Sequence, residues 1–492
     1  MTVYLTFDIG TTALKTALVG EDGAVLAIAE EEYSPHTPQP GRMEMEPERY
    51  WEAAVAGSRR VVARAGIDPG RVAAIGLSSQ AQSFLALDAS GRPLTPVIVW
   101  LDGRARELAE RWATDWLSAQ RYRAISGYPW VPHELTLFKI AWLAENRPQM
   151  HARAAWFLCL PDYLVLRLTG EVATDYNIAQ MSGMLDLRAG RWHQELLQAA
   201  RISEDQLPTV HGPGTPVGEV TAVAAGEPGI PAGTPVCVGC NDQLAGAIGA
   251  GNVRPGVVTE TTGTALAVVA TTAELLDDER LFVGRHAVEG ASYAMPFAPV
   301  SAAVLTWFRD LCGEAGGWDE FLAGVEDVPP GSDGLTVVPH FSGTASPTFN
   351  PDARGAMVGL TLAHGRAHIA RAIMESCACV LRELLEPVTD HGIDLRTVCS
   401  LGGAARSDTW LQMKADMLGV PVERPACPEA ASLGAAMLAA TGTGVFESLQ
   451  DAADTWYRPS ATFQPDPKRA AACAEIHERY LDAYHRLYGR EE

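Results

Sequence analysis

The same short pattern occurs twice in the chain, about 250 residues apart. Residues 3–7 (VYLTF) predict a strand, residues 8–12 (DIGTT) a tight turn, and residues 13–19 a second buried strand. Residues 257–269 (VVTETTGTALAVV) repeat this order, but the carboxylate is lost from the turn itself, where Thr261 and Thr262 precede Gly263. This recurrence predicts two domains of similar plan. The alternative is that any two glycine-containing hairpins look alike.

The chain length agrees with two domains, because 492 residues exceed what one hydrophobic core usually serves. We place the domains at residues 1–245 and 246–492. Strands and helices alternate along the chain, which predicts an α/β fold. The predicted strands are 24–33, 72–78 and 236–240, and the predicted helices are 47–65, 135–146, 153–168, 241–250 and 366–386, the last of them stopped by Pro387.

Composition excludes some classes of function. The formal net charge is −22, from 38 basic and 60 acidic residues, so nucleic acid is not an expected partner. We expect neither a signal peptide nor a membrane span. The nine cysteines are scattered, which favours reduced thiols and a cytoplasmic location.

Three glycine-containing turns could bind phosphate or nucleotide. In the first, backbone amides and threonine hydroxyls could hold a phosphate while Asp8 steers Mg²⁺, although a plain hairpin turn would explain the same residues. The second is the repeated turn at Thr262–Thr264. The third is LGGAARSD (401–408), which lies between a predicted strand and a predicted helix, where amides could receive a nucleotide.

Longer motifs resemble one family. TLFKIAWLAEN (136–146) is similar to the first signature of the FGGY carbohydrate kinases, except for Glu134 before it, and residues 355–376, preceded by NPDAR (350–354), are similar to the second. The resemblance covers nearly the whole chain. It implies two actin-like (ribonuclease H-like) domains around a central cleft, with ATP and Mg²⁺ as cofactors.

The resemblance also implies a role for individual residues. Asp242 would be the catalytic base; the alternative is that it only caps a helix. Asp8 would bind Mg²⁺, and the two turns would hold phosphate. The implied phosphate and nucleotide contacts are Gly10, Thr11, Thr12, Lys15, Thr262, Gly263, Thr264, Gly402, Gly403, Ala404, Ser407 and Gln412, with solvent exposure as the alternative for Lys15 and a surface pair with Asp416 for Gln412. The implied substrate contacts are Asp8, Gln80, Gln82, Trp100, Asp102, Arg104, Asn177 and Asp242, with a place in the core as the alternative for Trp100.

Within the family, the chain is most similar to xylulokinases, which implies a ketose such as xylulose as substrate. Two departures leave a polyol (glycerol or erythritol) or an aldonate as alternatives: Gln82 replaces a usual histidine, and GTASP (343–347) replaces a usual Glu-Arg-Thr-Pro run. Other classes considered are a chaperone or filament ATPase and a sugar-sensing pseudokinase. A homodimer is considered as the assembly.

A hinge is expected around residues 243–257, where small residues are frequent; close helix packing would also explain them.

Overall fold

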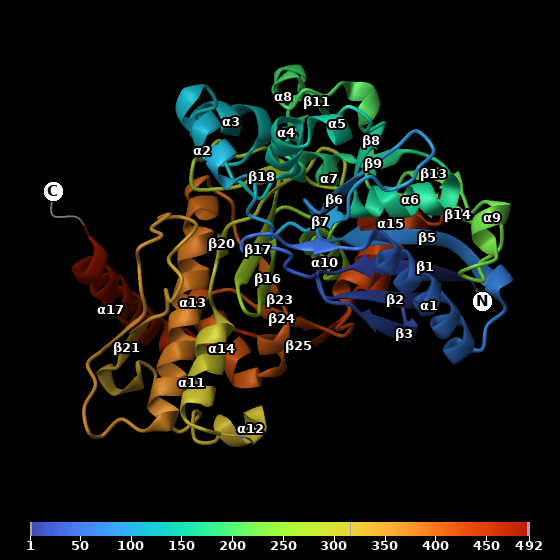
Figure 1. Cartoon of the computed structure of the whole chain (residues 1–492). Helices are drawn as coiled ribbons and strands as arrows, with labels where there is room; N and C mark the ends of the chain where they lie inside the picture. The colour runs from blue at the N-terminus through green and yellow to red at the C-terminus, as the bar shows by residue number, and fades with distance from the viewer. Residues whose placement is uncertain (1, 315, 490–492) are drawn as a thin grey trace.

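Two mixed β-sheets, one built mainly from each half of the chain, form the centre of the molecule (Figure 1). The computed structural model describes residues 2–314 and 316–489. The first sheet has the order β13 (Pro216–Glu219), β14 (Pro235–Cys237), β5 (Val72–Ser79), β1 (Val3–Ile9), β2 (Ala13–Gly20) and β3 (Val25–Glu32), with β15 (Cys240–Asn241) pairing the end of β5.

The second sheet follows the same plan around its own hairpin. Its order is β18 (Val283–Arg285), β19 (Ser292–Ala294), β17 (Leu266–Thr272), β16 (Val257–Thr262), β23 (Thr397–Leu401), β24 (Val422–Pro425) and β25 (Pro459–Phe463), with β20 (Phe297–Ala298) on β17. Strand β16 is antiparallel to β17 and parallel to β23, just as β1 is antiparallel to β2 and parallel to β5. The two hairpins therefore have the same strand pairing.

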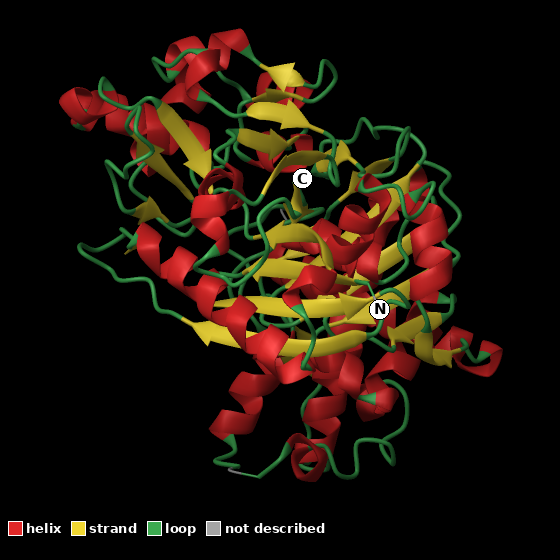
Figure 2. Cartoon of the chain, turned by 90° about the vertical axis from the view of Figure 1, so that its right-hand side faces the viewer, coloured by secondary structure: helices red, strands yellow, loops and turns green. Residues whose placement is uncertain are grey.

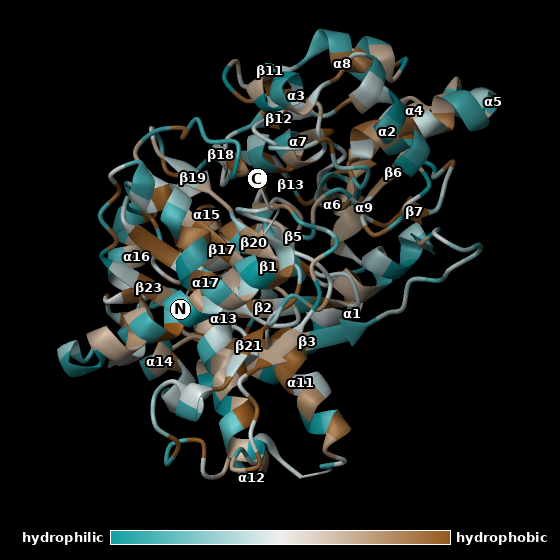
Figure 3. Cartoon of the chain, turned by 90° about the vertical axis from the view of Figure 1, so that its left-hand side faces the viewer, coloured by the Kyte–Doolittle hydropathy of each residue, from teal (hydrophilic) through white to brown (hydrophobic). Residues whose placement is uncertain are grey.

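Helices cover both sheets (Figure 2). Helix α1 (Pro47–Ala65) has the predicted bounds and packs against β2 and β3. Proline opens it, and Gly66 ends it in the left-handed conformation, φ 62°. In Figure 3, hydrophilic and hydrophobic residues both occur along α17 (Ala470–Tyr488), as expected for a helix with one side toward a core.

Smaller elements complete the chain. The first half also contains β4 (Glu44–Met45), β6 (Phe84–Leu87), β7 (Val97–Ile98), β8 (Trp156–Cys159), β9 (Ala173–Asp175), β10 (Leu185–Asp186), β11 (Arg191–Trp192), β12 (Thr209–His211), α2 (Arg106–Asp115), α3 (Ala119–Ser126), α4 (Thr136–Asn146), α5 (Pro148–His151), α6 (Leu160–Thr169), α7 (Tyr176–Met181), α8 (Gln194–Ala199), α9 (Ala222–Ala225) and α10 (Asp242–Gly249). The second half also contains β21 (Thr336–Val338), β22 (Ala356–Val358), α11 (Ala302–Leu311), α12 (Trp318–Phe321), α13 (Arg366–Asp390), α14 (Asp408–Leu418), α15 (Ala430–Gly442) and α16 (Leu449–Trp456).

Two sequence predictions about helices were wrong. Residues 153–168 are not one helix, because the apolar run of β8 pairs with β6 before α6 begins at Leu160. A short apolar run fits a buried strand as well as a helix. Pro387 does not stop α13, which continues to Asp390. Pro387 and Val388 are buried, so packing offsets the backbone hydrogen bond that proline cannot make.

The helix α15 connects the two halves. It comes from the C-terminal part of the sequence but packs on β5 and β1 of the first sheet and against α10 (Figure 1). Glycines allow this close approach: a Cβ on Gly76 would lie 2.3 Å from the carbonyl oxygen of Ala435, and one on Gly434 would lie 1.9 Å from that of Ala245. The division at residue 245 stays a prediction, and it falls inside α10.

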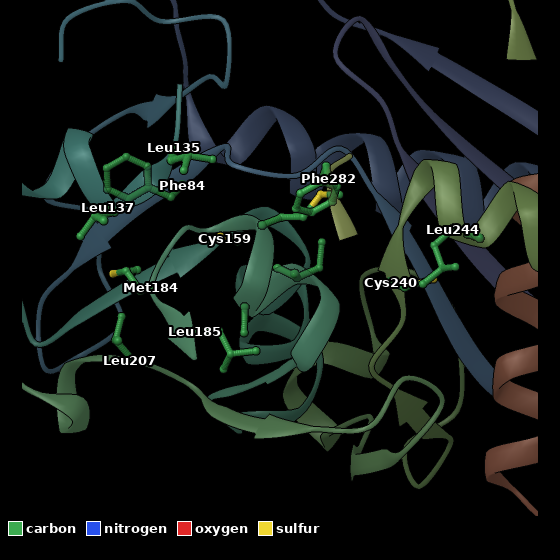
Figure 4. Close-up of a cluster of buried hydrophobic side chains, with 14 of the residues drawn as sticks. Phe84, Leu135, Leu137, Cys159, Met184, Leu185, Leu207, Cys240, Leu244 and Phe282 are labelled. Atoms are coloured by element: carbon green, nitrogen blue, oxygen red, sulfur yellow. The ribbon is translucent and has the colours of Figure 1, made fainter. Parts of the chain in front are cut away.

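One hydrophobic cluster also extends across both halves. Figure 4 shows Phe84 and Cys159 of the first half in the same cluster as Cys240 and Leu244 at the start of α10, and Phe282 of the second half. This shared core fixes the N-terminal end of α10. Among the described residues, none of the helices combines the length and the apolar character that a bilayer crossing requires.

Candidate active site

The first glycine turn lies between β1 and β2 and carries an acid at its base. Asp8 lies opposite Lys15 on β2 and beside Ser78 on β5. The Ser78 hydroxyl donates to Asp8 Oδ1 over 2.7 Å. Burial raises the pKa of Asp8, although this hydrogen bond and the positive charge of Lys15 oppose the rise.

Lys15 pairs with an acid from the second half of the chain. Its Nζ lies 2.9 Å from Oε2 of Glu429, the residue that precedes α15. Burial would lower the pKa of Lys15, but the hydrogen bond and negative charge of Glu429 outweigh it and raise the pKa. Lys15 therefore links the first turn to α15, and its contact with phosphate stays a prediction.

Two predicted substrate residues, Gln80 and Trp100, contact the first turn, and their contact with substrate stays a prediction. Gln80 Nε2 donates to the carbonyl oxygen of Gly10 over 2.8 Å, and the Thr11 hydroxyl donates to Gln80 Oε1 over 3.3 Å. The Trp100 indole N–H donates to Thr11 Oγ1 over 3.0 Å. The Tyr33 hydroxyl also donates to the Gly10 carbonyl, over 2.7 Å. These contacts hold the turn in one conformation, and Thr12 is exposed.

Asp102 and Arg104 bind each other. Arg104 donates through Nε and Nη2 to the two Asp102 oxygens, each over 2.7 Å, and Nη2 also lies 2.6 Å from Glu44 Oε1. Burial opposes ionisation of Asp102, but hydrogen bonds from Arg104 and from the amide of Met43 outweigh it and lower the pKa. The pair stabilises the loop that carries Trp100, and direct substrate contact by either residue stays a prediction.

Gln82 lies in a strained part of the loop between β5 and β6. Its φ is 68°, a left-handed conformation that is uncommon outside glycine, and its Nε2 lies 3.2 Å from the Tyr128 hydroxyl. Such strain recurs at functional sites.

Asp242 is the first residue of α10. The cap of this helix is Asn241, whose Oδ1 accepts from the amide of Leu244 over 3.0 Å, so Asp242 is not the cap residue. The Asp242 carboxylate accepts from the next amide, that of Gln243, over 2.8 Å. Burial raises the pKa of Asp242 to about 7, and the negative charge of Asp8 adds to the rise. The two carboxylates of the site therefore influence each other.

Asn177 supports the start of α10 from the side. Its Oδ1 accepts from the amide of Asn241 and its Nδ2 donates to the Tyr293 hydroxyl, both over 2.8 Å. The residue is fully buried, so it joins the halves beside Asp242.

The second and third turns border one cavity of about 1430 Å³. Its lining includes Thr262, Gly263 and Thr264 of the second turn, Gly403, Ala404 and Ser407 of the third, and Trp307, Trp318 and Trp410. Gly402 lies behind the lining; its φ is 81°, and a Cβ there would lie 2.9 Å from the Thr262 carbonyl. Gln412 lies outside the lining, where its amide donates to Asp416 and to the Gln464 carbonyl.

The sequence prediction missed the acid of the second turn. Glu260 is fully buried and lies on β16 beside Ser400, as Asp8 lies on β1 beside Ser78. An ungapped alignment of the two hairpins would have found it, because it places Asp8 on Glu260 and Thr12 on Thr264. Its partner Lys414, at 2.5 Å, gave no such signal, because it lies 154 residues away.

The residues present fit a magnesium nucleotide. Gly263 and Gly403 have open space where a Cβ would be, so a ligand can approach their backbone. Among the described residues, no three His, Cys, Asp or Glu side chains gather as a metal cage. Mg²⁺ in proteins usually binds one or two carboxylates together with phosphate oxygens and water. Asp8 could supply the carboxylate.

Comparisons with known proteins agree with this arrangement. Residues 3–249 match the N-terminal domain, and residues 258–443 the C-terminal domain, of the FGGY family of carbohydrate kinases. The chain is 29% identical to the xylulose kinase of Bacillus subtilis over 98% of its length and 97% of the relative's. It is 32% identical to the glycerol kinase of Methylibium petroleiphilum, over 96% of this chain and 97% of the relative.

A solved structure has the same fold over almost the entire length of both chains. The gluconate kinase of Lactobacillus acidophilus superposes with a TM-score of 0.91 at 25% identity, covering 99% of this chain and 98% of that one. Both halves of the chain match one family, and the paired turns, the Asp242 helix and the large cavity agree with it: the chain belongs to the FGGY family of carbohydrate kinases.

Proposed function

We propose that this carbohydrate kinase transfers the γ-phosphoryl group of ATP to a terminal hydroxyl of a ketose, xylulose or a related ketopentose, with Asp242 as general base. The observation that carries the proposal is the half-buried carboxylate of Asp242 at the start of α10, whose pKa of about 7 is raised by burial and by Asp8. A base with a pKa near the working pH is effective, because it is ionised and still basic enough to take a proton.

The other residues would bind and orient the reactants. Asp8 would hold Mg²⁺, which neutralises phosphate charge when it is bound. The amides around Gly10 and Gly263 and the exposed hydroxyls of Thr12 and Thr264 would receive phosphate oxygens. The adenosine would occupy the cavity beside Gly403 and Ala404. The cytoplasmic location and the homodimer stay predictions.

The relatives favour a sugar or polyol without selecting one. A xylulose kinase and a glycerol kinase are about equally similar in sequence, and a gluconate kinase has nearly the same fold. A polyol or an aldonate is therefore the second candidate. ADP release measured with Mg²⁺ over a panel of ketoses, polyols and aldonates tests both; the proposal fails if no compound in any of the three classes stimulates release.

Sugar discrimination should respond to Gln82. Substituting Gln82→His is expected to change the ranking among ketoses and polyols, because the amide and the imidazole present different donors and acceptors. The ATP KM should change little, since Gln82 contacts Tyr128 and not the nucleotide cavity. Histidine also tolerates the left-handed backbone better than most residues. Steady-state kinetics on the panel provide the measurement, and an unaltered ranking would contradict this placement.

The pH dependence of kcat/KM should report the ionisation of Asp242. Asp242 must lose its proton to act, so kcat/KM is expected to rise with pH and level off above about 7. Burial raises the pKa of Asp175 to about 7 as well, but its carboxylate caps α7. Asp175→Asn keeps an oxygen that can cap the helix and is the matched control: it should retain the rising limb. Loss of the limb in that variant would assign the titration to Asp175.

A further inference from the structure

The two hairpins have an acid at the same strand position, but only the second acid is paired with a buried lysine. Asp8 lies beside Ser78 across β1 and β5, and Glu260 lies beside Ser400 across β16 and β23. In each pair the serine hydroxyl donates to the carboxylate. Asp8 remains half-buried and its nearest cation, Lys15, pairs with Glu429. The first acid is therefore available to a ligand.

The second acid is neutralised inside the protein. Lys414 Nζ lies 2.5 Å from Glu260 Oε1, and the side chains of the two residues are 1% and 0% exposed. A buried carboxylate without a cation would be costly by itself, and it would also repel phosphate at the adjoining turn. Lys414 removes both effects.

This ion pair reaches the second turn through Thr262. The Thr262 hydroxyl donates to Glu260 Oε2 over 2.5 Å and accepts from Lys414 Nζ over 2.9 Å. The ammonium also lies 5.5 Å from the centre of the Trp410 ring. Thr262 and Trp410 both line the cavity, so Lys414 contacts two parts of the wall from behind.

We propose that Lys414 is a positioning residue for nucleotide binding, a role that rests on the proposed function. It fixes the side chain of Thr262 inward, so that Gly263 and the exposed Thr264 form the face toward the phosphates. It also cancels the charge of Glu260 beneath that face. Lys414 itself touches no phosphate. The two hairpins thus use the same strand position differently. In the first, Asp8 is left to bind the ligand; in the second, Glu260 is paired with Lys414 and supports the turn.

The test is ADP affinity in the presence of Mg²⁺, measured by calorimetry on the full chain. Lys414→Met leaves Glu260 buried without its cation, and its Kd for ADP is expected to rise about tenfold or more, since a group beside the phosphate site becomes an unpaired negative charge. The double variant Glu260→Gln with Lys414→Met contains no buried charge, so it should fold and lose less affinity, about threefold. It still loses affinity because Thr262 has lost a donor.

A control separates positioning from stability. Asn252→Ala removes hydrogen bonds to Thr259, Val269 and Thr271 of the same hairpin, none of which lines the cavity, so it should lower Tm while the Kd for ADP stays at the wild-type value. If Lys414→Met lowers Tm but leaves the Kd unchanged, the role is structural and the proposal is overturned. If Lys414→Met does not fold, an unchanged Kd in the double variant overturns it. Wild-type protein that does not bind ADP would instead refute the proposed function.

Discussion

Asp242→Asn is expected to lower kcat by about 10²–10⁴-fold, the usual contribution of a positioned general base. The fold should survive, because the cap of α10 is Asn241 and an asparagine oxygen at position 242 can still accept from the amide of Gln243. ADP binding should also remain, since Asp242 lies outside the lining of the nucleotide cavity. Single-turnover and steady-state assays measure the rate of phosphoryl transfer and kcat, and calorimetry on the same sample measures ADP binding.

The same variant should be more stable than the wild type in alkaline solution. The pKa of Asp242 rises from its usual 3.8 to about 7 on folding, so the carboxylate favours the folded state only while it holds its proton. That contribution is full below about pH 4 and is lost as pH rises through about 7. The neutral amide of the Asp242→Asn variant has no such loss, so the variant's Tm should exceed the wild-type Tm at pH 8, with the gap closing toward pH 4.

Asn241→Ala is the control for the helix cap. Losing the cap should cost about 1 kcal/mol of stability at every pH, while the base remains in place. If Asp242→Asn retained near-normal turnover, or if Asn241→Ala lost as much activity as Asp242→Asn, the assignment of Asp242 as base would be wrong.

Local sequence patterns were sufficient to predict the strands and helices whose type depends on residues close by in the sequence. The hairpins at β1–β2 and β16–β17 were predicted because β-branched residues flank a glycine turn, and α1 because apolar residues recur at helical spacing along 47–65. The start of α10 was predicted from its polar N-terminus. The local pattern offered a phosphate turn, with Asp8 steering Mg²⁺, as one of two interpretations. The family resemblance favoured that interpretation and assigned the base to Asp242, and the structure shows the surroundings of these residues rather than their chemistry.

Contacts between distant segments could not be predicted in this way. Nothing in the local sequence of Trp100 or Gln80 says that their side chains bind the first turn, and the mutual pairing of Asp102 and Arg104 depends on how one loop closes. The apolar α15 has no hydrophilic side to indicate what it faces. Its position on the first sheet follows from tertiary packing alone.

The small residues of α10 illustrate the same limit. Their composition was interpreted as a hinge, with helix packing as the alternative, and the structure places them in a close crossing with α15. A Cβ on Gly249 would lie 1.9 Å from the Ala430 carbonyl oxygen and 2.7 Å from the Gly434 nitrogen, so the helices could not keep their present separation. A hinge elsewhere in the predicted range stays a prediction.

Gly249→Ala is therefore expected to destabilise the protein by about 1–3 kcal/mol, as overpacking does, and to affect catalysis as well. Asp242 is at the other end of the same short helix, and a displacement of about 1 Å at a reacting group can lower the rate by about 10²-fold. Gly246→Ala is the matched control, three residues away on α10: its Cβ would meet only Leu401 at 3.5 Å, an ordinary contact. There alanine should stabilise the helix by about 0.4–1 kcal/mol and leave kcat unchanged. Urea unfolding and kcat measured on both variants decide the matter, and equal behaviour of the two would show that the crossing of α10 and α15 does not control the position of the base.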